Sequence, residues 1–276
     1  GVELASVDGP LIGARFGTAL AGLDLDQDGA GDVLVGAPGA WSSIVAFGAG
    51  QVWRLDGETG ATLGVHTGTQ AFEGYGSSLA ALGDIDGDGV EDWILGAPDF
   101  AVLGNGDGRA QVRSGLDGSL IREHIGAFGQ GLGSAVADAG DANGDGVADY
   151  AYGSPHVLAL ASFDEFERVS VRSGVDGSEL RLYSRGPVVS PYTIDDDGYS
   201  NLTVESGFGT ILSGGGDRDG DGFPDIAAGL PRTSFPPAEP GGTSAWSFGL
   251  VGTGSARLRA GQRPRRRHHR ARRQLD

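Results

Sequence analysis

The chain has 276 residues, of which 52 are glycine and 12 are proline, and it contains no cysteine and no run of eighteen apolar residues. These features exclude disulfides, thiolate metal sites, cysteine nucleophiles and a membrane-spanning helix. The net charge of −17 combines 36 acids and 11 arginines in residues 1–256 with one acid and nine arginines in residues 257–276. A body this acidic repels nucleic acid and anionic membranes and attracts cations.

Short alternating apolar runs bounded by glycine predict β-strands in chain order. The first unit has runs at Thr18–Leu23, Asp32–Ala37, Gln51–Leu55 and Thr62–His66. The second unit repeats the series at Ser77–Leu82, Asp92–Ala97, Ala110–Arg113 and Leu120–His124. No window has a capped apolar stripe of helical period, so the predicted class is all-β. Four short antiparallel strands in each unit of about 60 residues predict the blades of a β-propeller.

Four acidic strings of nine residues recur with matching flanks, at Asp24–Asp32, Asp84–Asp92, Asp141–Asp149 and Asp217–Asp225. Their starts are 60, 57 and 76 residues apart. An upstream pair ending in glycine precedes each string: Phe16-Gly17, Tyr75-Gly76, Leu132-Gly133 or Phe208-Gly209. A Gly-x-Pro follows each string, beginning at Gly36, Gly96, Gly153 or Gly229. This repetition indicates an array of similar units.

The acidic strings read Asp-x-Asp-x-Asp-Gly-x-x-Asp, with asparagine at position 3 of the third string. Positions 1, 3, 5 and 9 offer side-chain oxygens, position 7 offers a carbonyl, and glycine at position 6 permits the sharp turn. With one water, six or seven oxygens result, which suits Ca²⁺. The predicted ligands of about four sites are Asp24, Asp26, Asp28, Ala30 and Asp32; Asp84, Asp86, Asp88, Val90 and Asp92; Asp141, Asn143, Asp145, Val147 and Asp149; and Asp217, Asp219, Asp221, Phe223 and Asp225.

The bound cation would offset the repulsion among closely packed carboxylates, which is about 1 kcal/mol per pair in water and about 4 kcal/mol near a protein surface. Asn143 leaves the third site with one negative charge fewer, so we expect that site to bind calcium most weakly. The alternative for each string is an acidic, solvated turn without a metal.

The combination of Phe-Gly, acidic loop and Gly-Ala-Pro resembles the FG-GAP repeat, which is best known from the β-propeller of integrin α subunits and also occurs in bacterial exported proteins. The resemblance covers about residues 14–242. It implies blades around a central axis, a calcium ion in the hairpin loop of many blades, and a role in adhesion or binding. This chain departs from the pattern at Leu132, Asn143, Ser154 and Leu230, and none of these changes removes an oxygen ligand.

We expect an incomplete or compact propeller. Its parts are residues 1–13, the end of a preceding repeat or a linker; 14–69, blade 1; 70–127, blade 2; 128–205, blade 3 with an insertion at about 187–206; 206–256, a partial blade 4; and 257–276, a basic tail. The insertion is the first candidate for a contact region, and a solvated loop is the alternative. Its Asn201-Leu202-Thr203 fits a glycosylation sequon, a short pattern that is common by chance.

Three origins remain open for the basic tail. Because GC-rich codons for Asp-Gly runs encode arginine when they are read out of frame, the tail could be a frameshifted continuation of the repeat. It could also be a disordered basic segment or a nucleic-acid-binding arm. The repeat pattern becomes weak after Gly242, which favours the first two origins.

No catalytic constellation stands out. His66 and His124 end corresponding strands and therefore belong to the blade structure, His156 has no recognisable catalytic partner, and no glycine-rich phosphate loop occurs. We expect a non-enzymatic calcium-binding module that is secreted, on the cell surface or periplasmic, because sites with a Kd of about 10⁻⁴–10⁻³ M would be empty in the cytosol. Its expected partner is a protein or glycan at the cell surface, and not nucleic acid. The alternatives are an accessory propeller of a larger secreted hydrolase and a calcium-stabilised structural spacer.

Overall fold

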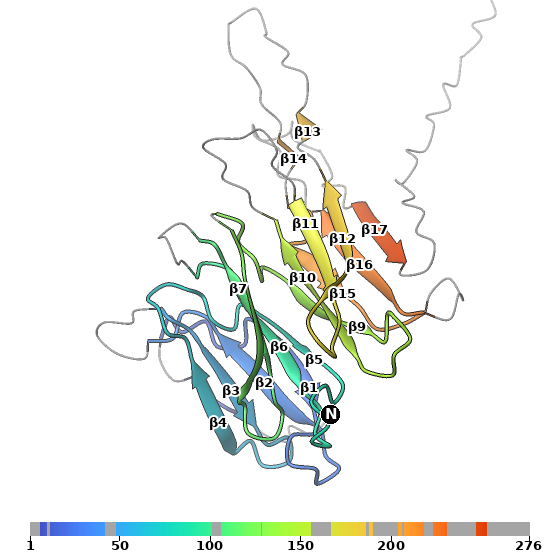
Figure 1. The fold of residues 1–276 in the computed structure, drawn as a ribbon. Coiled ribbons are helices and arrows are strands. Elements are labelled where there is room, and N and C mark those ends of the chain that lie inside the picture. Colours follow the sequence, from blue (N-terminus) through green and yellow to red (C-terminus); the bar gives the residue numbers. More distant parts are fainter. Residues whose placement is uncertain are drawn as a thin grey trace, which may run out of the picture.

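The computed structural model describes residues 6–9, 12–41, 48–100, 106–127, 129–155, 167–185, 188–189, 204–205, 207–217, 223–230 and 247–252. All regular structure in these residues is β-strand (Figure 1). None of them forms a helix with the length and apolarity that crossing a membrane requires. His156, the sequon Asn201–Thr203, most of the insertion and the basic tail lie outside the described residues.

The strands form successive antiparallel sheets, each built from neighbours in sequence. The first sheet contains β1 (Leu20–Leu23), β2 (Asp32–Ala37), β3 (Gln51–Leu55) and β4 (Thr62–Thr67). The second contains β5 (Ser78–Ala81), β6 (Trp93–Ala97), β7 (Arg109–Arg113) and β8 (Leu120–Ile125). The third contains β9 (Val136–Gly140), β10 (Asp149–Ser154), β11 (Glu167–Arg172) and β12 (Glu179–Arg185). These three blades confirm the predicted class, and the strands of the first two lie within one or two residues of the predicted ranges.

A fourth sheet has three described strands, β15 (Ile211–Ser213), β16 (Asp225–Leu230) and β17 (Ser247–Gly252). β17 pairs with the whole length of β16, from Asp225↔Gly252 to Leu230↔Ser247. The third strand of this blade therefore lies beyond Gly242, where the repeat pattern in the sequence becomes weak. The two short strands β13 (Val188–Val189) and β14 (Val204–Glu205) pair with each other, so the two ends of the insertion meet as the base of a hairpin.

The sheets stack face to face in an open succession from β1–β4 to β15–β17 (Figure 1). The first strands of successive blades, β1, β5, β9 and β15, are neighbours of one another and mark the inner edge. The second strand β6 is buried along its whole length, because a blade covers each face, whereas no residue of the outer strand β8 is buried. Apolar clusters fill the interfaces, with Leu34 and Trp93 between the first two blades and Ile94 and Tyr150 between the next two.

Both glycines of the FG-GAP pattern have a structural reason at these interfaces. Gly76 donates its N–H to the carbonyl of Gly96 within its own blade, at 3.1 Å. A Cβ added to Gly96 would lie 1.9 Å from the carbonyl oxygen of Gly133 in the next blade. A Cβ added to Gly36 would likewise lie 2.1 Å from the carbonyl oxygen of Gly76 in the next blade. Backbone therefore packs directly on backbone where blades meet, which leaves no room for a side chain.

Candidate metal centres

The acidic strings fold into loops that connect the first and second strands of each blade. In the first three loops, the position 1 aspartate accepts the N–H of the position 6 glycine. These bonds run from Gly29 to Asp24 at 3.1 Å, from Gly89 to Asp84 at 2.9 Å and from Gly146 to Asp141 at 2.8 Å. The three glycines have φ values of 88°, 93° and 91°, a left-handed conformation that favours glycine. The predicted need for glycine at position 6 is confirmed.

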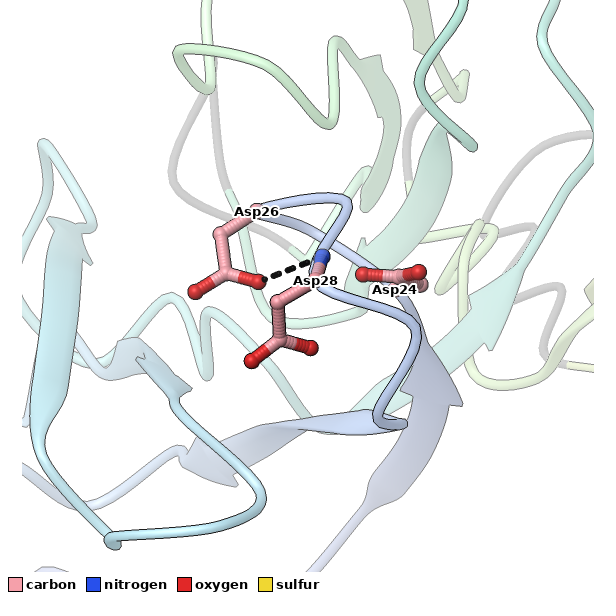
Figure 2. Close-up of side chains that lie close together, drawn as sticks. All are labelled: Asp24, Asp26 and Asp28. Carbon is pink, nitrogen blue, oxygen red and sulfur yellow. Dashed lines mark hydrogen bonds between the residues drawn. The ribbon is translucent and has the colours of Figure 1, made fainter.

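Carboxylates at positions 1, 3 and 5 come together in the first two loops. One ligand oxygen from each of Asp24, Asp26 and Asp28 lies within 4.8 Å of the others (Figure 2), and the same holds for Asp84, Asp86 and Asp88. Two oxygens on opposite sides of a calcium ion lie about 5 Å apart, since each Ca–O distance is about 2.3–2.6 Å. Both clusters therefore have the dimensions to hold a metal ion.

One oxygen in the first cluster fits this role in particular. Oδ1 of Asp24 is buried and has no hydrogen-bond partner, while Oδ2 accepts the N–H of Gly29. A buried carboxylate oxygen without a partner is costly unless a cation or donor reaches it. A cation bound between Asp24, Asp26 and Asp28 would supply that partner.

The third loop differs at position 3, as the sequence predicts. The Asn143 amide donates from Nδ2 to Oδ2 of Asp145 at 2.8 Å, while its Oδ1 accepts the Asp145 N–H at 2.8 Å. The side chain therefore partly satisfies a carboxylate that a cation would otherwise bind. In the fourth loop, Asp217 is exposed and Asp225 is buried, while Asp219 and Asp221 lie outside the described residues.

The position 9 aspartates are placed differently from the others. Asp32 is buried, and its carboxylate accepts N–H groups from Leu25 at 2.8 Å and Gly57 at 2.9 Å. Asp92 is held by Ile85 at 2.7 Å and Gly115 at 3.0 Å. Each aspartate thus clamps the acidic loop to the turn between the third and fourth strands. Each carboxylate oxygen has two lone pairs, so metal ligation by position 9 stays a prediction.

Burial affects the charge of these clamps. It raises the pKa of Asp92 to about 6, against the opposing effect of the N–H groups of Ile85 and Gly115. It also raises the pKa of Asp149, whose carboxylate accepts the N–H groups of Ala142 and Gly174 at 2.9 Å each. A nearby cation would lower both pKa values and keep the carboxylates ionised.

Sequence reasoning missed the residues that connect the loops to neighbouring blades. Arg54 of β3 donates to the carbonyl of Gly115 at 2.6 Å, in the turn that Asp92 holds. In the next blade Arg122 of β8 donates to the Gly174 carbonyl at 2.7 Å, in the turn that Asp149 holds. Val112 of β7 is the counterpart of Arg54 of β3, and Arg122 of β8 is paired opposite Val112. The same kind of contact, an arginine that donates to the turn of the next blade, therefore comes from the adjacent strand. We call these two arginine contacts the latches. Only the strand register reveals this equivalence.

His66 and His124 have structural positions, as predicted. The His66 ring lies 5.4 Å from that of Trp93 in the next blade, and His124 Nε2 lies 2.8 Å from the Tyr150 hydroxyl. Burial, followed by nearby arginines, lowers the pKa of both histidines to about 4. Both are therefore neutral at physiological pH.

Antiparallel blades with an acidic loop at the same place in each define a β-propeller of the FG-GAP type. The FG-GAP repeat family model matches residues 16–53. Integrin alpha-PS2 of Drosophila melanogaster is 33% identical over 75% of this chain, and integrin alpha-2 of Mus musculus is 32% identical over 53% of it. The chain is an FG-GAP repeat protein that resembles the integrin α subunits.

The matched regions are 14% and 13% of the lengths of these two integrins, so the chain corresponds to only a small part of such proteins. Among solved structures, a rhamnogalacturonan lyase of Bacillus licheniformis is similar with a TM-score of 0.42 and 10% identity. That similarity covers 88% of this chain and 50% of the lyase.

Proposed function

We propose that the chain is a non-enzymatic module that binds calcium in its acidic loops and works outside the cytosol. The observation that carries the proposal is the convergence of three carboxylates in each of two loops, with a buried and unpartnered oxygen on Asp24. Without a cation, like charges oppose the loop that holds them, at about 1 kcal/mol per pair in water and about 4 kcal/mol near a protein surface. A divalent cation reverses the sign of this contribution.

The location follows from the expected affinity. The first two clusters are mostly exposed, and their carboxylates come from short loops. Such sites belong to the class with a Kd of about 10⁻⁴–10⁻³ M, which is filled at extracellular calcium levels. Calcium then stiffens a surface that presents loops to a protein or glycan at the cell surface.

The insertion between the third and fourth blades is the proposed contact region. Its ends pair as β13 and β14, which project beyond β11 and β12 in Figure 1. Loops on a rigid scaffold are a common place for binding residues, and the β13–β14 pair ties both ends of this insertion together.

The test uses the full chain and a variant in which residues 190–203 are replaced by Asn-Gly, a two-residue turn that preserves the β13–β14 pair. Both proteins are applied to arrays of purified glycans and extracellular-matrix proteins, with calcium or with chelator. Calcium-dependent binding that the variant loses is the expected result. Binding that is unaffected by chelator, or equal in both proteins, would contradict the proposed role of the loops. Turnover of a polysaccharide by the chain alone would contradict the non-enzymatic assignment.

A further inference from the structure

The first two acidic loops are joined directly across the interface between their blades. Gln27, at position 4 of the first loop, donates from Nε2 to the carbonyl oxygen of Gly89 at 2.7 Å. Gly89 occupies position 6 of the second loop, and 62 residues separate the two partners. The contact thus connects two candidate metal centres that are distant in sequence.

The connection continues through one peptide unit to a carboxylate of the second cluster. The Gly89 carbonyl shares its peptide group with the N–H of Val90, which donates to Oδ1 of Asp88 at 2.8 Å. A hydrogen bond accepted at a peptide oxygen polarises that peptide and strengthens the bond donated by its N–H. The Gly89 N–H donates to Asp84 at 2.9 Å. The two peptide groups that flank the Gly89 Cα therefore donate hydrogen bonds to two of the three clustered carboxylates.

The backbone of Gln27 shows that this contact is made at a cost. Gln27 has φ 61°, in the left-handed region, whereas the equivalent positions of the next two loops are Gly87 with φ 81° and Gly144 with φ 77°. Glycine adopts this conformation more easily than glutamine does. The first loop therefore has a strained backbone at Gln27 where the next two loops use glycine, and the Gln27 side chain makes the contact between loops.

We propose that Gln27 couples the two metal sites, so that an ion in either loop raises the affinity of the other. An ion between Asp26 and Asp28 would fix the backbone of the residue between them and thereby the direction of its side chain. The carbonyl of Gly89 would then be held in place, and with it the bonds to Asp84 and Asp88. Linkage requires the effect to be reciprocal and of equal size in both directions.

This inference rests on the proposed calcium binding. A single hydrogen bond contributes about 0.5–1.5 kcal/mol, so the coupling factor should be about 2–13-fold. Gly87, the residue equivalent to Gln27 in the second loop, has no side chain that could reach the third loop. The second and third sites therefore form an internal comparison in which this coupling is missing.

The test is a calorimetric calcium titration of full-length chains in which Asp141→Asn and Asp217→Asn weaken the third and fourth sites. Each titration is made with Gln27 and with two variants. Gln27→Ala removes the side-chain donor but keeps a non-glycine residue in the left-handed backbone conformation. Gln27→Gly removes the donor and the backbone strain together. The affinity of the second site is measured in each background with and without Asp24→Asn.

With Gln27, Asp24→Asn should lower the affinity of the second site by about 2–13-fold, while in both Gln27 variants it should have no effect. An equal effect of Asp24→Asn in all three backgrounds, or no effect with Gln27, would overturn the coupling and leave calcium binding intact. A titration without binding to any variant would overturn the proposed function and the coupling together.

Discussion

Substitution of Gly96 by alanine should destabilise the fold strongly, although it leaves the acidic loops untouched. The new Cβ would lie 1.9 Å from the Gly133 oxygen and 2.4 Å from Oγ of Ser78. Because real Cβ contacts are essentially never closer than 3.0 Å, the two backbones must separate by about 1 Å. That movement would open the apolar cluster between β6 and β10 and weaken the 2.8 Å bond from Ser78 to the Gly133 carbonyl.

Overpacking of this kind costs about 3 kcal/mol, which corresponds to a fall in Tm of about 6–12 °C for a chain of this size. Gly31→Ala is the matched control, since a Cβ there meets nothing within 4 Å, and the equivalent position in the third loop is already Ala148. Thermal melts of both variants in the same calcium buffer provide the comparison. Equal melting temperatures would refute the view that backbone contact between blades requires these glycines.

Further predictions concern the latches, the histidines and the third acidic loop. Arg122→Met keeps the aliphatic stem but removes the hydrogen bond to Gly174, so it should lower the free energy of unfolding by about 1–3 kcal/mol in urea titrations. If Arg122→Met lowered the free energy of unfolding less than Arg122→Lys does, the result would argue against the latch. His66 and His124 have folded pKa values of about 4 and an ordinary value of 6.5, so the unfolded state binds more protons between these limits. Their contribution to stability should be complete above pH 6.5 and be lost as the pH falls toward 4. The double variant with glutamine at both positions should show a weaker pH dependence in chelator, and an unchanged profile would exclude the histidines as its cause. Asn143→Asp should raise the affinity of the third site about tenfold by adding a carboxylate, as measured by calorimetry, and equal or lower affinity would contradict the ranking of the sites.

Much of the blade architecture could be predicted because local signals agree with the fold. Alternating runs and glycine boundaries locate strands such as β2 and β7 closely, and the repeat places the acidic loops. β17 cannot be predicted in this way, since its sequence has little in common with β3 and only its pairing with β16 identifies it.

The different roles of the aspartates within a loop could not be predicted. Asp32 and Asp28 look equivalent in sequence, yet Asp32 is buried against backbone N–H groups while Asp28 is exposed in the cluster. Burial depends on the turn at Gly57, which approaches from another part of the chain. The Gln27 contact has the same origin, because it depends on the stacking of blades and leaves no local pattern.

Whether the acidic loops hold calcium is tested by a calcium-dependent melt of the full chain joined to a calorimetric titration. At a free calcium concentration ten times the Kd, each occupied site adds about 1.4 kcal/mol, so about four sites should raise Tm by about 10 °C or more. Calcium binding in the loops predicts this rise, a stoichiometry near four, and a loss of about one site in Asp24→Asn. An unchanged melt with no binding heat at millimolar calcium would contradict it and identify the loops as solvated acidic turns.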